Sequence, residues 1–129
     1  MKSRWLDRAI IVGPCLALCL TEAEYLRQMR RLRITNPPPF CETSGATLHT
    51  FEGSGDFDRV CIVCMHEHRD ATLADVHAIL AHEAAHIWQG WCRWAHETNP
   101  GNEVEAYAIQ FLAGRLMAEY DRQTGRGQG

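Results

Sequence analysis

The chain has 129 residues, of which 46% are hydrophobic and 22% are charged. These values are ordinary for a soluble globular protein, and the length suits one domain with a modest core, so we expect a single domain over residues 1–129. The net charge of -3 gives no reason to expect a surface for nucleic acid or for an anionic membrane.

Residues 1–45 are predicted to hold a short apolar segment followed by a helix. Basic residues precede the apolar stretch AIIVGPCLALCL, as in a signal peptide, but Asp7 lies among them and Gly13-Pro14 interrupts the stretch. The stretch is also too short to be a membrane helix. We therefore expect a cytoplasmic protein.

Thr21 and Glu24 have the spacing of a capping box, which predicts the start of an amphipathic helix that runs through Ile34. The sequence Asn-Pro-Pro-Pro at 36–39 ends it, because proline cannot continue a helix. Its basic residues are interpreted as a solvated helix face, with a binding patch as the alternative: Arg27, Arg30, Arg31 and Arg33.

The runs ATLHTF and FDRVCIVCM are rich in strand-forming residues and are joined by EGSGD, so residues 46–68 are predicted to form a hairpin. Six cysteines could form three disulfides. Several of them lie in apolar or β-branched runs, as small core residues do, so we expect reduced thiols.

The segment CIVCMHEH within this hairpin is one candidate metal site. Cys61 and Cys64 have CxxC spacing, but the Ile-Val pair between them favours a strand over the tight turn of a zinc knuckle. In a strand, Cys64, His66 and His68 would share one face, so a metal site there stays open. The alternative is an edge strand along which a peptide could lie extended.

A helix is predicted over residues 72–95, and it contains HEAAH at 82–86. His82 and His86 project from one face of such a helix, where they can be two ligands of a tetrahedral Zn²⁺ ion. Glu83 lies about 100° around the helix and suits a general base acting on a metal-bound water. The alternative is a helix that merely carries two histidines on its polar face.

A further helix is predicted over 102–122, followed by a tail at 123–129. It opens with Glu103 and Glu105, either of which could supply a carboxylate to the metal. Two residues apart on a helix they point in nearly opposite directions, so one can be the ligand and not both. Glu105 could instead form a capping box with Asn102.

HEAAH followed by NEVEAY resembles the gluzincins, which are HExxH metallopeptidases with a glutamate as third zinc ligand. LAHEAAHIWQ with EAYAIQFLAGRLM is also similar to small uncharacterised zincin-like proteins of bacteriophages. The resemblance covers residues 72–120. It implies an α+β, minimal zincin-like domain, with a small sheet packed on the HExxH helix and a second, glutamate-bearing helix. A phage origin would place the protein in the host cytoplasm.

The resemblance gives two indications of the third ligand. The N-E-x-x-A context favours Glu103, whereas the spacing HEAAH-x18-Glu favours Glu105. We expect Glu103, because the loop between the helices can change length, and we keep Glu105 as the alternative. Tyr107 falls where related families often place Asp or Asn. It could orient a histidine, steady an oxyanion, or merely pack, and further oxyanion candidates are Arg93 and His96.

The expected function is therefore that of a zinc-dependent hydrolase, a metallopeptidase that cleaves a peptide or protein substrate with a zinc-activated water. The alternative is a catalytically silent, zinc-stabilised binding or inhibitory protein. The chain is too short for the second domain that completes the cleft in larger relatives. A folded partner or oligomerisation would have to complete it, and the oligomeric state is open.

Overall fold

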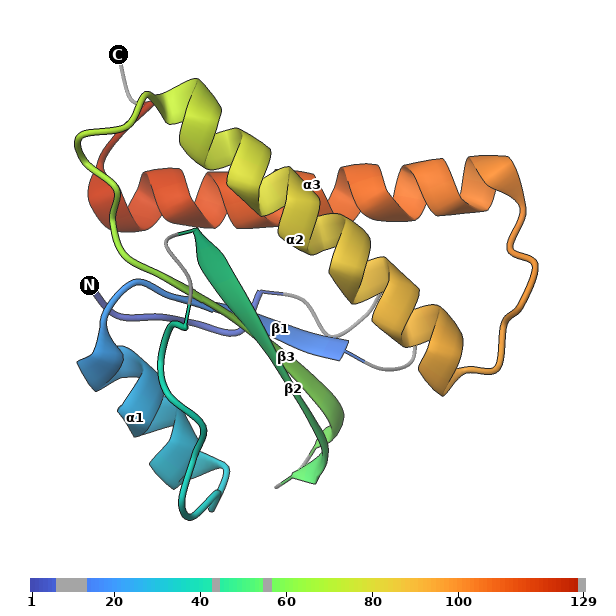
Figure 1. Ribbon diagram of the computed structural model, residues 1–129, viewed down its shortest axis with the longest axis horizontal. Helices are drawn as coiled ribbons and strands as arrows, with labels where there is room; N and C mark the ends of the chain where they lie inside the picture. The colour runs from blue at the N-terminus through green and yellow to red at the C-terminus, as the bar shows by residue number, and fades with distance from the viewer. Residues whose placement is uncertain (7–13, 43–44, 55–56, 128–129) are drawn as a thin grey trace. The chain divides into compact units, whose positions relative to one another are not determined.

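The computed structural model describes residues 1–6, 14–42, 45–54 and 57–127. The chain divides into two compact units, Met1–His68 and Arg69–Gly129. In the described residues the first unit holds a three-stranded sheet and one helix, and the second holds two long helices (Figure 1). The expected α+β class is confirmed. The packing of the HExxH helix on the sheet, and a single domain over 1–129, stay predictions.

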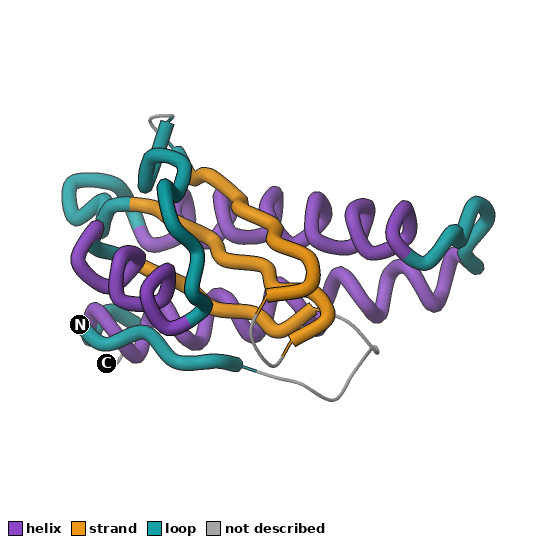
Figure 2. Tube along the Cα trace, turned by 90° about the horizontal axis from the view of Figure 1, so that it is seen from below, coloured by secondary structure: helices purple, strands orange, loops and turns teal. Residues whose placement is uncertain are grey.

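The sheet of the first unit, whose strands are orange in Figure 2, consists of β1 (Pro14–Cys19), β2 (Ala46–Ser54) and β3 (Phe57–Met65). The strand order is β1-β3-β2. β2 and β3 pair antiparallel, so the predicted hairpin is confirmed, although β3 ends three residues before the predicted limit. β1, expected only as an apolar segment, pairs parallel to β3.

Helix α1 (Glu22–Arg31) begins where the capping pattern predicts, because the side chain of Thr21 accepts a hydrogen bond from the backbone N–H of Glu24. It ends earlier than the predicted Ile34. Leu32 is the C-cap, and Arg33 adopts a left-handed conformation with φ 59°, which a helix cannot continue.

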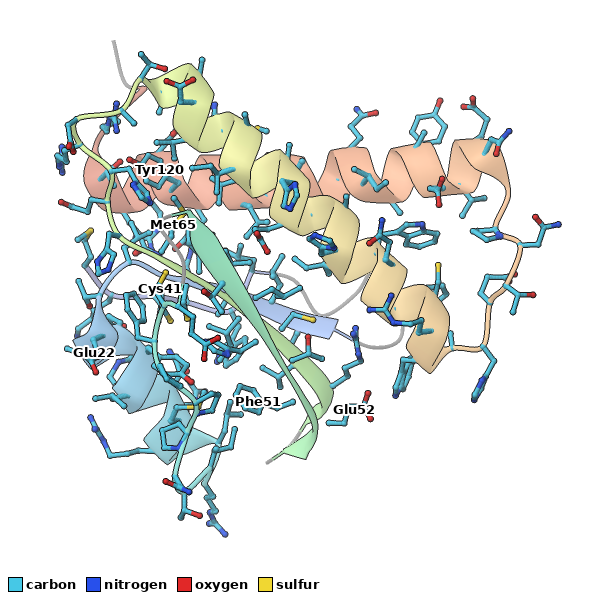
Figure 3. All side chains as sticks on the ribbon, in the orientation of Figure 1. Glu22, Cys41, Phe51, Glu52, Met65 and Tyr120 are labelled. Carbon is cyan, nitrogen blue, oxygen red and sulfur yellow. The ribbon has the colours of Figure 1, made fainter. Side chains whose placement is uncertain are left out.

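α1 packs on one face of the sheet. Successive strand residues alternate between the two faces, so Phe51 points toward α1 while Glu52 points the other way (Figure 3). The core on this face is formed by Cys15, Cys19, Tyr25, Met29, Leu32, Phe40, Val60, Ile62 and Cys64.

The N-terminal residues are tied to α1. Ser3 donates both its backbone N–H and its hydroxyl to Glu24, and Gln28 donates to the Ser3 hydroxyl. Asp7 and Gly13, on which the prediction against a signal peptide depends, lie outside the described residues. Among the described helices, none is long and apolar enough to span a membrane.

The second unit consists of α2 (Leu73–Trp94) and α3 (Asn102–Thr124), which pack against each other. Their bounds lie within two residues of those predicted, and Thr72 caps α2 by accepting from the N–H of Asp75. They run in opposite directions, as shown by a hydrogen-bonding contact of 2.9 Å between Nε2 of His77, near the start of α2, and Oδ1 of Asp121, near the end of α3.

α3 begins at Asn102, as predicted. Its N-cap is Gly101, without a side-chain cap, so the alternative role of Glu105 in a capping box with Asn102 is excluded, because Asn102 is already helical. At the other end, the helix continues to Thr124 and stops at Gly125, whose φ of 73° suits glycine. Arg126 then bonds the hydroxyl of Tyr120, which is labelled in Figure 3, so this part of the tail is fixed.

Candidate metal centre

α2 brings His82 and His86 together. Their Nε2 atoms lie 3.1 Å apart, and the ring centroids lie 4.7 Å apart at 77°. Both side chains are exposed. A tetrahedral Zn²⁺ ion with bonds of about 2.0–2.1 Å holds two nitrogens roughly 3.3 Å apart. The pair therefore has close to the separation that one zinc ion requires.

A neighbouring amide prepares His86 for metal binding. Its Nδ1 lies 3.1 Å from Oε1 of Gln89. With an amide oxygen as partner, the Nδ1–H of His86 would donate, and its Nε2 would be the nitrogen left to bind a metal ion. Gln89 would in this way orient one ligand.

Glu83 has a different environment from the two histidines. It is 7% exposed, and its burial raises the pKa of its carboxyl, an effect that the nearby His82 and His86 partly oppose. A carboxylate with a raised pKa takes up a proton more readily near neutral pH. This is the property expected of a general base. Glu83 lies between the two histidines in the sequence, and about 60° to 100° from them around the helix.

The candidate third ligands lie apart from this pair. Trp88 donates its indole N–H to Oε2 of Glu105 at 2.9 Å. Trp88 follows His86 by two residues and so projects about 200° around α2 from it, which places Glu105 on another side of the helix. Glu103 is exposed in the first turn of α3.

Over the part of the chain that the structure describes, no group of three or more His, Cys, Asp or Glu side chains is arranged to hold a metal ion. The two histidines fit zinc, and the carboxylate that would complete the set is not beside them. Glu103 as ligand, with Glu105 as the alternative, stays a prediction.

The candidate oxyanion residues are at the surface. Tyr107 is 65% exposed and is not part of the core. Arg93 is exposed in the last turn of α2, two helical turns beyond His86. His96 follows the C-cap of α2 with a left-handed φ of 57°. The roles of all three in catalysis stay predictions.

The arrangement predicted for CIVCMHEH is wrong in two respects. β3 ends at Met65, so His66 and His68 lie beyond the strand and do not share a face with Cys64. His66 packs edge-on against Phe40, and His68 bonds the carbonyl of Gly45 at 3.0 Å. β3 is also the central strand, with both sides paired, so it is not an edge on which a peptide could lie.

All six cysteines are described, and all are free thiols. Cys19 and Cys64 are register partners on β1 and β3, and both are fully buried. The Cys64 thiol donates to Cys19, and this hydrogen bond together with burial raises the pKa of Cys64 and lowers that of Cys19. Burial raises the pKa of Cys61. Cys61 and Cys64 are therefore poor nucleophiles and poor metal ligands.

Sequence reasoning missed two features of these sites. The Cys19–Cys64 contact depends on parallel pairing between strands far apart in the chain, which leaves no local pattern. The bond between Trp88 and Glu105 depends on how α2 and α3 align.

No family model, curated protein or solved structure matches this chain. The resemblance to the gluzincins therefore depends on the HEAAH and NEVEAY residues alone.

Proposed function

We propose that this protein is a zinc-dependent hydrolase, specifically a metallopeptidase, whose metal is held by His82 and His86. The observation that carries the proposal is the separation of 3.1 Å between their Nε2 atoms, and the buried Glu83 lies between them in the sequence. We also propose a minimal zincin-like fold and a cytoplasmic location. If a phage encodes the chain, this would be the cytoplasm of the host cell.

The roles of the side chains follow from their chemistry. Bound zinc would supply a coordinated water with a pKa lowered toward 7 and would polarise the scissile carbonyl. Glu83 would accept the proton of the attacking water and then pass it to the leaving amine. The raised pKa of its carboxyl favours this exchange near neutral pH. Gln89 would keep His86 in the ligating tautomer.

The third ligand is proposed to be Glu103. It makes no hydrogen bond or ion pair with the other described residues, and it lies in the first turn of α3, which lacks a side-chain cap. Glu105 would first have to release the indole of Trp88. Loss of that bond is an added cost that Glu103 does not incur.

A second candidate is a catalytically silent zinc-binding protein that binds or inhibits a partner. The observation that favours it is the separation of the histidine pair from any third ligand in the described residues. Two imidazoles can hold zinc at the surface without forming a catalytic site.

The test compares zinc content and peptide cleavage, with zinc in excess, for the wild type and for Glu83→Gln. The substrate is a mixture of unstructured peptides whose products are identified by mass. We expect Glu83→Gln to keep zinc and lose cleavage, and His82→Ala to lose both. His66→Ala, an exposed histidine elsewhere in the chain, is the matched control. Zinc binding without cleavage in the wild type would favour the silent protein.

A further inference from the structure

Four exposed residues form a stripe along α2: Asp75, His82, His86 and Arg93. At 100° per residue, these positions fall within about 40° of one another around the helix axis. The two histidines are in the middle, the acidic residue is near the start of the helix, and the basic residue is near its end. This surface is distinct from the buried side of α2 that carries Glu83.

The coordination of the pair is incomplete. Zinc prefers four ligands, and each chain presents two nitrogens at the correct separation on an exposed surface. Among the described residues no third side chain joins them. A second copy of the chain would present the same two nitrogens, and two such pairs give a complete tetrahedral set. A two-fold axis through the metal would relate the copies.

The charges on the stripe fit this arrangement. If two α2 helices lie antiparallel with His82 of one copy facing His86 of the other, the two-fold axis meets α2 at the level of residue 84, on the exposed face opposite the buried side chain of Ala84. Position 84 is also midway in sequence between Asp75 and Arg93. Each Asp75 therefore falls opposite Arg93 of the second copy, and the dimer would contain two such ion pairs. A parallel arrangement would instead place like charges together.

The surface beside the histidines also permits close approach. Ala78 is exposed and Ala85 is partly exposed, and both border the stripe. Their methyl side chains leave room for a second helix on this side of the stripe, whereas the longer side chain of Gln89 is also exposed and lies nearer to its centre. Bulky side chains at these two positions would hold the helices apart.

We propose that one zinc ion joins two copies of this chain through His82 and His86 of each, with Asp75 of one copy paired to Arg93 of the other. The inference rests on the proposed zinc site and adds a form of regulation to it. Four nitrogen ligands leave no coordination position for water, so the zinc-joined dimer does not hydrolyse peptides. When zinc is in excess, each copy binds its own zinc ion, the dimer dissociates, and a coordination position becomes available for water.

The experiment measures molar mass by light scattering or sedimentation while zinc is added to the metal-free protein. We expect the dimer fraction to peak near one zinc per two chains and to fall as zinc approaches one per chain and exceeds it. His82→Ala should remove both zinc binding and the dimer. A monomer that binds one zinc throughout the titration overturns this inference and leaves the proposed function intact. Absence of zinc binding overturns both.

Charge reversal tests the alignment separately. Arg93→Asp should weaken the zinc-dependent dimer about 3- to 10-fold, since it places two acidic residues opposite each other. Asp75→Arg combined with Arg93→Asp should restore the wild-type dimer. Arg115→Asp, an exposed arginine on α3, is the matched control. A dimer that forms without zinc, or that ignores both substitutions, contradicts the proposed arrangement.

Discussion

Trp88 on α2 donates its indole N–H to the carboxylate of Glu105 on α3, at 2.9 Å. The indole is almost completely buried and stacks on Trp91 with the rings 5.2 Å apart. The contact links the two long helices near the loop that joins them. It also directs Glu105 away from the histidine pair.

Glu105→Ala should therefore cost stability and leave zinc in place. Removing the acceptor leaves a buried indole N–H unpaired, for which we expect a loss of about 1–3 kcal/mol in the free energy of unfolding. Glu103→Ala should leave stability nearly unchanged and weaken zinc binding. Denaturant unfolding and zinc titration of both variants check this.

Glu105→Gln is the matched control, because its amide oxygen can still accept from Trp88. If Glu105→Ala loses zinc while Glu103→Ala keeps it, the third ligand is Glu105 and the hydrolase proposal survives.

The buried Glu83 should make stability depend on pH in the metal-free protein. Its pKa is raised by burial, so the folded state disfavours the charged form. The resulting loss in the free energy of unfolding is absent below the ordinary pKa of a glutamate, about 4.3, and grows as the pH rises above it. Glu83→Gln should thus be more stable than the wild type at pH 7, and equal to it at pH 3.5.

Unfolding curves in the presence of a chelator, measured from pH 3.5 to pH 8, test this difference. Glu42→Gln, at an exposed position in the first unit, should show no such pH-dependent gain. Parallel curves for the wild type and Glu83→Gln would mean that the burial of Glu83 carries no electrostatic cost.

Glu24 should change the stability with pH in the opposite direction to Glu83. Its hydrogen bonds from Arg27 and Ser3 lower its pKa to about 2. The stability from its charged form is present above the ordinary glutamate pKa, and it is lost as the pH falls toward 2. Each pKa unit corresponds to about 1.4 kcal/mol, and screening at the partly exposed Arg27 reduces the total, so we expect about 1–3 kcal/mol.

Glu24→Gln should lose this amount at pH 7 and show a flatter profile between pH 2 and pH 5. Glu22→Gln is the control, since Glu22 is exposed in the same helical turn (Figure 3). An equal loss in both variants would assign the effect to the helix terminus and not to the contacts with Ser3 and Arg27.

The cysteines should stabilise the fold through packing and not through disulfide bonds. All six are free, so strong reductant should leave the melting temperature unchanged while zinc is saturating. Replacing Cys61 and Cys64 with Ser should lower stability, because both are buried, and leave the zinc stoichiometry intact. A loss of zinc confined to this variant would contradict the hydrolase proposal.

Local patterns predict most of the elements. Thr21 and Thr72 act as N-caps, and the strand-rich runs around EGSGD form the hairpin. The histidine pair is also a local feature, because four residues of helix fix its geometry. These features depend on residues that are close together in the sequence.

Features that join distant segments were not predictable in this way. In the sequence, β1 is only an interrupted apolar stretch. It becomes a strand by pairing with β3, and this pairing makes β3 the central strand. The position of a third ligand depends on the alignment of α2 and α3, which the contacts His77–Asp121 and Trp88–Glu105 fix. Neither contact has a sequence motif.

The parallel pairing of β1 with β3 has a consequence for folding. The β2–β3 hairpin is local and can form within microseconds, whereas β1 must wait for a strand that begins about 40 residues later. During synthesis the apolar β1 therefore emerges from the ribosome well before its partner. We expect the nascent chain to be most prone to aggregation in that interval, and a chaperone that shields residues 14–19 to raise the yield of folded protein.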